Sequence, residues 1–196
     1  MTTYRVTMTF TEPMLGTAPQ DKEIYSNYIL EANGNGDDTT DELETVRDEK
    51  GRTGFHKLED GSPIIYDYML KGFFKDACSM LTRVDGSYSK KIKAYRKIID
   101  GLVFVFPRRI PLKLAGPITI LERPLRAQTA QGERVALAAS EMAPEGTSIT
   151  FTIDVLEDAT VTENLLREWL NYAKYRGLGQ WRNGSYGRAT YIMERC

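Results

Sequence analysis

The chain contains little cysteine, one histidine, almost no net charge and no long apolar run. Its two cysteines, Cys78 and Cys196, cannot build a disulfide framework or a cysteine-rich metal site. No stretch approaches the roughly 20 apolar residues that span a bilayer, and the start of the chain lacks a basic leader followed by an apolar segment. We therefore expect a cytoplasmic protein with no membrane partner.

Motifs for several common chemistries are also missing. The sequence has no P-loop, no nucleophile elbow and no dinucleotide fingerprint, because Gly177-x-Gly179 follows a predicted helix rather than a strand. Carboxylates are plentiful but scattered, so no spacing favours a metal-dependent nuclease. The sequence predicts neither a metal nor a cofactor.

The composition is that of an ordinary globular protein. Hydrophobic residues make up 41% of the 196 residues and charged residues 27%. A chain of this length and composition can bury a hydrophobic core without disulfides or a structural metal. We predict a single domain over residues 1–196. It would contain a polar insertion at about 17–62, which includes the acidic, glycine-rich stretch Asn33–Asp38, and a basic insertion at about 86–126.

Charge is segregated along the chain, although the net charge is only −1. Residues 31–60 contain ten acidic and four basic residues, and residues 127–172 contain eight acidic and two basic. In contrast, residues 69–126 contain thirteen basic and four acidic residues, and residues 173–196 contain five basic and one acidic. If the two basic segments meet in space, they form a positive surface suited to phosphates. The alternative is that the lysines simply solvate exposed faces.

Hydrophobic periodicity predicts the main elements. Alternation over 4–10, 134–142 and 148–156 indicates strands, the last two as a hairpin, and 102–106, 118–121 and 188–193 are further strand candidates. Helical spacing predicts a helix from residue 68 with a stripe of Leu70, Phe73, Phe74, Ala77 and Leu81.

Two further helices are predicted. A basic helix covers 89–100, and a second main helix opens at the capping box Thr160–Glu163, with Leu166, Trp169, Leu170 and Ala173 as its buried stripe. With the insertions set aside, the order of elements is βαββαβ. The predicted fold class is therefore α+β and ferredoxin-like, an antiparallel sheet with both helices on one face.

Residues 177–188, the glycine loop, combine four glycines, two arginines and two aromatic residues between that helix and the last strand. Glycine lets backbone N–H groups approach a ligand closely, arginine offers charged donors, and aromatic rings offer stacking faces. This mixture favours a phosphate–ribose backbone as the ligand. The alternative is a helix C-cap followed by a tight turn, which needs only one or two of the glycines.

Four segments in the same order resemble the RAMP superfamily of RNA-binding proteins from CRISPR systems, in particular the backbone subunits that coat guide RNA. They are residues 11–16, 60–75, 140–147 and 177–188. In the second, Leu70-Lys71-Gly72 followed by Lys75 is similar to the family's leucine-basic-glycine step at the first helix. The chain departs from the family just before it, where Tyr66–Met69 replaces small residues. Aspartates that cut target RNA in some members have no matching context here at Asp21 or Asp37-Asp38.

The resemblance implies a non-catalytic RNA-binding protein whose partners are RNA, including guide RNA, and other subunits of a CRISPR-like ribonucleoprotein. The residues predicted to contact RNA are Lys71, Lys75, Arg108, Arg109, Gly177, Gly179, Trp181, Arg182, Gly184, Tyr186, Gly187 and Arg188. Two alternatives stay open. One is a stand-alone or virus-encoded interaction protein that imitates an effector subunit, in the manner of an anti-CRISPR. The other is a metal-independent endoribonuclease that processes guide RNA and uses His56 as its acid or base.

Overall fold

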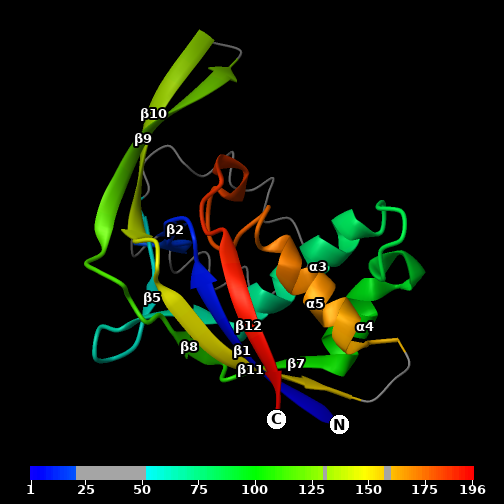
Figure 1. Cartoon of the computed structure of the whole chain (residues 1–196). Helices are drawn as coiled ribbons and strands as arrows, with labels where there is room; N and C mark the ends of the chain where they lie inside the picture. Colours follow the sequence, from blue (N-terminus) through cyan, green and yellow to red (C-terminus); the bar gives the residue numbers. More distant parts are fainter. Residues whose placement is uncertain (21–51, 130–131, 157–159) are drawn as a thin grey trace.

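The computed structural model describes residues 1–20, 52–129, 132–156 and 160–196 (Figure 1). The candidates Asp21 and Asp37-Asp38 and most of the predicted polar insertion lie outside these residues. The strands are β1 (Thr2–Phe10), β2 (Met14–Leu15), β3 (Ala18–Pro19), β4 (Arg52–Gly54), β5 (His56–Lys57), β6 (Pro63–Tyr66), β7 (Val103–Phe106), β8 (Arg109–Pro111), β9 (Thr119–Thr129), β10 (Gly132–Ala143), β11 (Ser148–Val155) and β12 (Ala189–Arg195). The helical elements are α3 (Asp67–Leu81), η1 (Ser89–Lys91), α4 (Tyr95–Leu102), α5 (Glu163–Tyr172) and η2 (Arg182–Gly184).

A four-stranded sheet with the order β12-β1-β11-β7 forms the centre of the molecule, and each neighbouring pair is antiparallel. The chain passes from β1 to β7 through α3 and α4, and from β11 to β12 through α5. Figure 1 shows the three α-helices together on one side of this sheet. The predicted α+β class is confirmed, and the sheet has the predicted number of strands with a helical connection in each half.

Alternating side chains of the sheet build the core. The odd face of β11 and the even face of β1 are buried, including Phe151, Val6 and Met8 at 1% exposure or less. They meet the buried stripe of α3 and that of α5, where Trp169 is fully buried. Because a strand exposes alternate residues, the opposite sheet face carries polar side chains such as Thr7 and Thr150, whose hydroxyls lie 3.1 Å apart.

The predicted hairpin between 134–142 and 148–156 is wrong. Both strands exist, but β10 pairs with β9, β4 and β2, whereas β11 pairs with β1 and β7. The turn between them is held by β1 instead: Phe10 N–H donates to the Thr147 carbonyl at 2.9 Å, and Gly146 N–H donates to the Phe10 carbonyl at 2.8 Å. Alternation identifies a strand but not its partner, and β11 lies between β1 and β7, the second of which is inside the segment predicted as a basic insertion.

The predicted helix over 89–100 is divided into η1 and α4. Ala94 takes a left-handed backbone conformation with φ of 53°, which interrupts the helix. Ser89 is fully buried, with its N–H and hydroxyl both donating to Glu168. The cap of α5 also differs from the prediction, because Thr162 rather than Thr160 accepts the Leu165 N–H.

Two smaller sheets flank the central one. The first has the order β2-β10-β4-β3, with β9 paired to β10, and lies on the side away from the helices (Figure 1). The second has the order β5-β6-β8 and leads directly into α3. None of the helices in the described part of the chain combines the length and the apolar character needed to cross a bilayer.

Candidate nucleic-acid interface

The glycine loop lies against the connection between β1 and β2. Gly187 N–H donates to the Pro13 carbonyl at 2.8 Å, and Gln180 N–H donates to the Leu15 carbonyl at 3.3 Å. Within the loop, Leu178 N–H donates to the Gly187 carbonyl at 3.0 Å. Gly16 N–H in turn donates to the Glu141 carbonyl at 2.9 Å. Three of the four segments that carry the family resemblance therefore meet in space.

The glycines of this loop are required by packing within the protein. A Cβ on Gly177 would lie 2.0 Å from the carbonyl carbon of Gly187, and one on Gly187 would lie 1.8 Å from the Leu178 oxygen. Gly179 has φ of 88° and approaches the Leu15 oxygen, while Gly184 lies under the Trp181 ring. Their predicted contact with RNA stays a prediction, because close backbone packing already explains why glycine stands at these positions.

Beneath the loop lies a polar network that sequence reasoning missed. Gln180 is 7% exposed, and its Oε1 accepts from Thr53 Oγ1 and from Ser140 Oγ, both at 2.9 Å. The network joins β4, β10 and the glycine loop. No local pattern in the sequence marks it, because its three members come from segments far apart in the chain.

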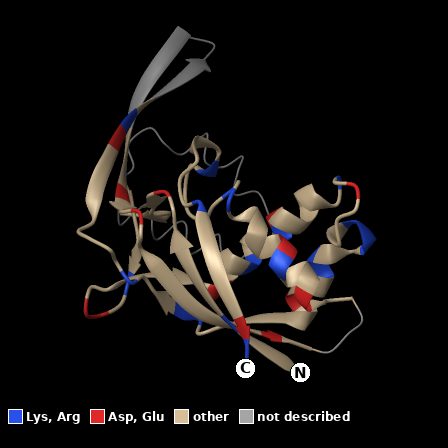
Figure 2. Ribbon diagram, in the orientation of Figure 1, with Lys and Arg blue, Asp and Glu red and all other residues tan. Residues whose placement is uncertain are grey.

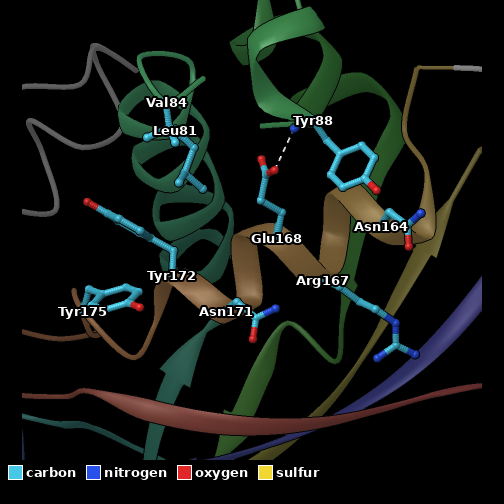
Figure 3. A pocket seen from close by; sticks show the side chains of 9 residues that line it. All are labelled: Leu81, Val84, Tyr88, Asn164, Arg167, Glu168, Asn171, Tyr172 and Tyr175. Atoms are coloured by element: carbon cyan, nitrogen blue, oxygen red, sulfur yellow. Dashed lines mark hydrogen bonds between the residues drawn. The ribbon is translucent and has the colours of Figure 1, made fainter. Parts of the chain in front are cut away.

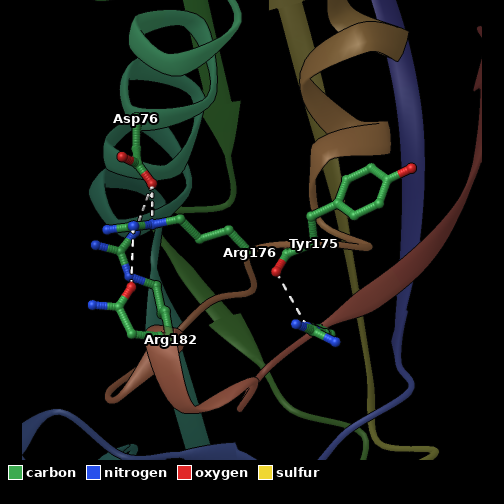
Figure 4. A network of polar contacts seen from close by, with 6 residues as sticks. Asp76, Tyr175, Arg176 and Arg182 are labelled. Carbon is green, nitrogen blue, oxygen red and sulfur yellow. Dashed lines mark hydrogen bonds and ion pairs between the residues drawn. The ribbon is translucent and has the colours of Figure 1, made fainter.

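An arginine cluster lies between α3 and the glycine loop (Figure 4). Asp76 Oδ2 pairs with Arg176 Nε at 2.7 Å and with Arg182 Nη1 at 3.3 Å, and all three side chains are 19–22% exposed. Arg188 Nε donates to the Tyr175 carbonyl at 3.1 Å, a neutral acceptor. Arg182 is therefore held inward by a carboxylate, whereas the charge of Arg188 is not compensated by its contact with Tyr175.

The aromatic residues of the loop lie beside a further guanidinium group. The Trp181 and Tyr186 rings stack with centroids 5.2 Å apart, and the Arg123 guanidinium lies 4.2 Å from the Trp181 centroid. Trp181 is 39% exposed and has φ of 54°, a conformation that bulky residues rarely adopt. Arg123 and Trp181 come from the two basic segments, which thus meet in space, but Arg123 is only 8% exposed, so this contact does not itself form a positive surface.

The other predicted basic residues form a second group near the start of α3. Lys71 Nζ donates to the Asp100 carbonyl at 3.3 Å, and Lys75 Nζ pairs with Asp100 Oδ2 at 3.0 Å. Arg108 precedes β8 and Arg109 begins it, both are exposed, and the Arg108 carbonyl accepts the Asp67 N–H at 3.0 Å. Acidic and basic positions are interspersed over the helices in Figure 2, so the helical side does not carry charge of one sign.

His56 lies on β5 and packs edge-on against Tyr66, with ring centroids 4.9 Å apart. Burial lowers the pKa of His56, which favours the neutral imidazole at neutral pH. Among the residues that the structure describes, no three His, Cys, Asp or Glu side chains are grouped to hold a metal ion.

Glu141 ties β10 to the segment that precedes β6. Its Oε1 accepts from Lys57 Nζ at 2.9 Å, and its Oε2 accepts the Phe55 N–H at 3.0 Å. Burial alone raises the pKa of Glu141, but the Lys57 ammonium, the Phe55 N–H and the charge of Arg52 outweigh it and hold this pKa below its usual value.

Replacing Glu141 by glutamine should lower the free energy of unfolding at pH 7 by about 1–3 kcal/mol, the range for hydrogen bonds to charged groups. The Lys57–Glu141 ion pair contributes little of this free energy, because the Lys57 side chain is 42% exposed and water can solvate its ammonium group when the carboxylate is lost. Because the pKa of Glu141 is lower in the folded than in the unfolded state, its carboxylate stabilises the protein fully at pH values above the unfolded-state pKa of about 4.3. This stabilisation is lost as the pH falls from there through the folded-state pKa. Urea unfolding at pH 7, 4 and 3 should therefore show the two proteins converging as the pH falls below about 4.3, whereas the exposed control E145Q should match wild type throughout.

A groove of about 610 Å³ lies on the helical side, between the end of α3 and α5 (Figure 3). The lining includes three tyrosines and two asparagines, and the full set is Leu81, Val84, Tyr88, Asn164, Arg167, Glu168, Asn171, Tyr172 and Tyr175. The Glu168 carboxylate is occupied by the Tyr88 and Ser89 N–H groups, and Arg167 pairs with Glu163 at 2.8 Å. Phenol, amide and aliphatic groups suit a protein segment better than a phosphate backbone.

Comparison with known proteins finds a likeness of fold to solved structures but no match of sequence. No protein-family profile matches the sequence, and no curated protein matches it. Among solved structures, a chain of the Type III-B Cmr-beta complex bound to cognate target RNA is similar, with a TM-score of 0.55 and 13% identity. The match covers 99% of this chain but 60% of that one, so this protein spans about three fifths of its structural neighbour.

A more distant neighbour belongs to a Type IV-B CRISPR complex, with a TM-score of 0.49, 12% identity and coverage of 98% of this chain and 90% of that one. The neighbour with the TM-score of 0.55 is a chain of a CRISPR effector complex, the class of assembly that the RAMP resemblance named. At such identity the likeness concerns the fold.

Proposed function

We propose that this chain is a non-catalytic RNA-binding protein of the RAMP type, which holds single-stranded or guide RNA beside its glycine loop. The observation that best supports this is the stacked pair of Trp181 and Tyr186 in the glycine loop, which also carries Arg188. The Arg123 guanidinium of β9 lies against the Trp181 ring. The fold likeness to a subunit of an RNA-bound effector complex supports it independently.

In this proposal the glycines shape the loop and the side chains bind the ligand. Arg188 Nε donates to a neutral carbonyl, so its remaining N–H groups can be offered to a phosphate, as guanidinium groups do in many nucleic-acid sites. Tyr186 and Trp181 form a stacked pair whose partly exposed rings lie in reach of a base. Arg182 would make a weaker contribution, because Asp76 compensates part of its charge.

Substitution of Arg188 by alanine should weaken binding of a fluorescein-labelled single-stranded RNA by about tenfold, the effect of removing one charge-assisted hydrogen bond. The slope of log affinity against log salt should also become shallower by about 0.7 for each phosphate that Arg188 neutralises. Fluorescence anisotropy at several salt concentrations measures both. The matched control is R195A, at the far end of β12, the strand that follows Arg188, and it should bind like wild type.

Equal binding by R188A and wild-type protein would refute the assignment of this surface. If the wild-type protein bound no RNA at all but captured an assembled effector complex, the interaction-protein alternative would stand instead. The groove lined by Tyr88, Tyr172 and Tyr175 favours that second function, because tyrosine is enriched where proteins dock on one another.

A further inference from the structure

Three aromatic rings form a continuous row from β5 to the first turn of α3, and we call His56, Tyr66 and Tyr68 the aromatic row. The His56 ring meets the Tyr66 ring edge-on at 74°, with centroids 4.9 Å apart. The Tyr66 and Tyr68 rings are nearly parallel, at 14°, with centroids 5.4 Å apart. The row begins with the partly buried His56 and ends at Tyr68, which is 49% exposed.

The backbone explains why the row is rigid. Tyr66 ends β6 and is the N-cap residue of α3, so its position is fixed by a strand on one side and a helix on the other. Strand β6 pairs with β5 through His56 opposite Ile64 and with β8 through Tyr66 opposite Arg109. Since side chains alternate along a strand, His56, Tyr66 and Arg109 lie on one face of this small sheet.

Two consecutive arginines lie beside the row. Arg109 is the cross-strand neighbour of Tyr66, at a separation where side chains interact directly, and both Arg108 and Arg109 are exposed. The Lys71 ammonium is directed elsewhere, because it donates to the Asp100 carbonyl and lies 5.0 Å from the centroid of the Phe104 ring. The Asp67 carboxylate lies in the first turn of α3, where it interacts favourably with the positive end of the helix dipole.

From this arrangement we infer that the aromatic row is a stacking platform for a nucleobase of single-stranded RNA, with Arg108 and Arg109 binding the flanking phosphates. The inference rests on the proposed RNA-binding function and names a site separate from the glycine loop. Every base has a π-face, so stacking on Tyr68 does not require a particular sequence.

The test uses the full chain and an RNA that carries 2-aminopurine, whose fluorescence is quenched when it stacks on an aromatic ring. Replacing Tyr68 by alanine should weaken binding by about fivefold to a hundredfold, the effect of one stacked base, and should relieve the quenching. The salt slope should stay unchanged, because every phosphate contact is kept. Tyr68→Phe keeps the ring and should restore both the affinity and the quenching.

Two controls separate this site from other causes. Y88A removes a tyrosine that is 46% exposed in the groove of Figure 3, and it should bind RNA like wild type. R109A should weaken binding and also lower the salt slope, in contrast to Y68A. Circular dichroism melting checks that Y68A is folded, which is expected for a half-exposed helix position.

Failure of the inference is distinguishable from failure of the proposed function. If wild type binds RNA and R188A weakens it, but Y68A binds and quenches like wild type, the platform is refuted while the RNA-binding function stands. If wild type binds no RNA, the proposed function fails and the platform with it. Loss of affinity in Y68F as large as in Y68A would also refute stacking, because the ring is still present.

Discussion

Gly187→Ala is expected to destabilise the protein by roughly 2–5 kcal/mol. The added methyl group would lie 1.8 Å from the Leu178 oxygen, and the residue has φ of 71°, where a side chain is strained. Strain of a left-handed residue costs about 1–2 kcal/mol and a forced backbone shift about 1–3 kcal/mol. Thermal unfolding followed by circular dichroism should show a Tm lower by roughly 4–20 °C, since each kcal/mol shifts Tm by about 2–4 °C in a chain of this size.

Two alanine variants at other glycines separate the causes. Gly61 has φ of 85° but nothing within 4 Å, so G61A reports backbone strain alone and should lower stability by about 1–2 kcal/mol. Gly72 lies inside α3 with open space around it, so G72A should raise stability by up to about 1 kcal/mol through helix propensity. If G187A were no less stable than G61A, the close approach to Leu178 would not exist in solution.

Asp76→Asn has the second largest expected effect, a decrease of about 2–4 kcal/mol in the free energy of unfolding. The carboxylate is 19% exposed and pairs with both Arg176 and Arg182, so its neutralisation removes the negative charge between two poorly solvated guanidinium groups. Removing one partner of a buried ion pair costs about 3–5 kcal/mol, and the residual exposure of the cluster lowers this figure. Urea unfolding at neutral pH measures it.

The same variant tests the proposed binding surface. With Asp76 neutral, Arg182 is released from this carboxylate, and we expect the affinity for single-stranded RNA to rise several-fold in anisotropy measurements. The matched control is D85N, whose carboxylate is 95% exposed and pairs with Lys90, and it should change neither stability nor binding measurably. Unchanged or weaker RNA binding by D76N would show that Arg182 does not face the ligand.

Local periodicity predicted the elements well. The alternation of β1 and the helical stripes of α3 and α5 follow from burial on one face, and the residues expected in those stripes, such as Phe74 and Trp169, are buried. The sequence was less informative about pairing. Alternation over 134–142 is compatible with any neighbouring strand, and loop closure costs rise slowly with length, so proximity along the chain did not decide the partner of β10.

In the candidate site, too, local features were predicted from the sequence and contacts between distant segments were not. Composition singled out the glycine loop, but its glycines pack against Leu15, Leu178 and one another. The aromatic row was not found from sequence, because His56 and Tyr66 become neighbours only through the pairing of β5 with β6. Residues that join distant segments, such as Gln180 and Asp76, carry no local signature.

What the sequence determined by itself was the mixed α+β class, the burial stripes and the places where charge and glycine concentrate, since each depends on residues within a few positions of one another. The tertiary structure alone decided which strands are neighbours and which charges compensate each other. Asp76 and Arg182 are 106 positions apart, and whether that arginine faces a carboxylate or solvent depends on how α3 packs beside the glycine loop. Packing of this kind is a property of the whole chain, so no local pattern encodes it.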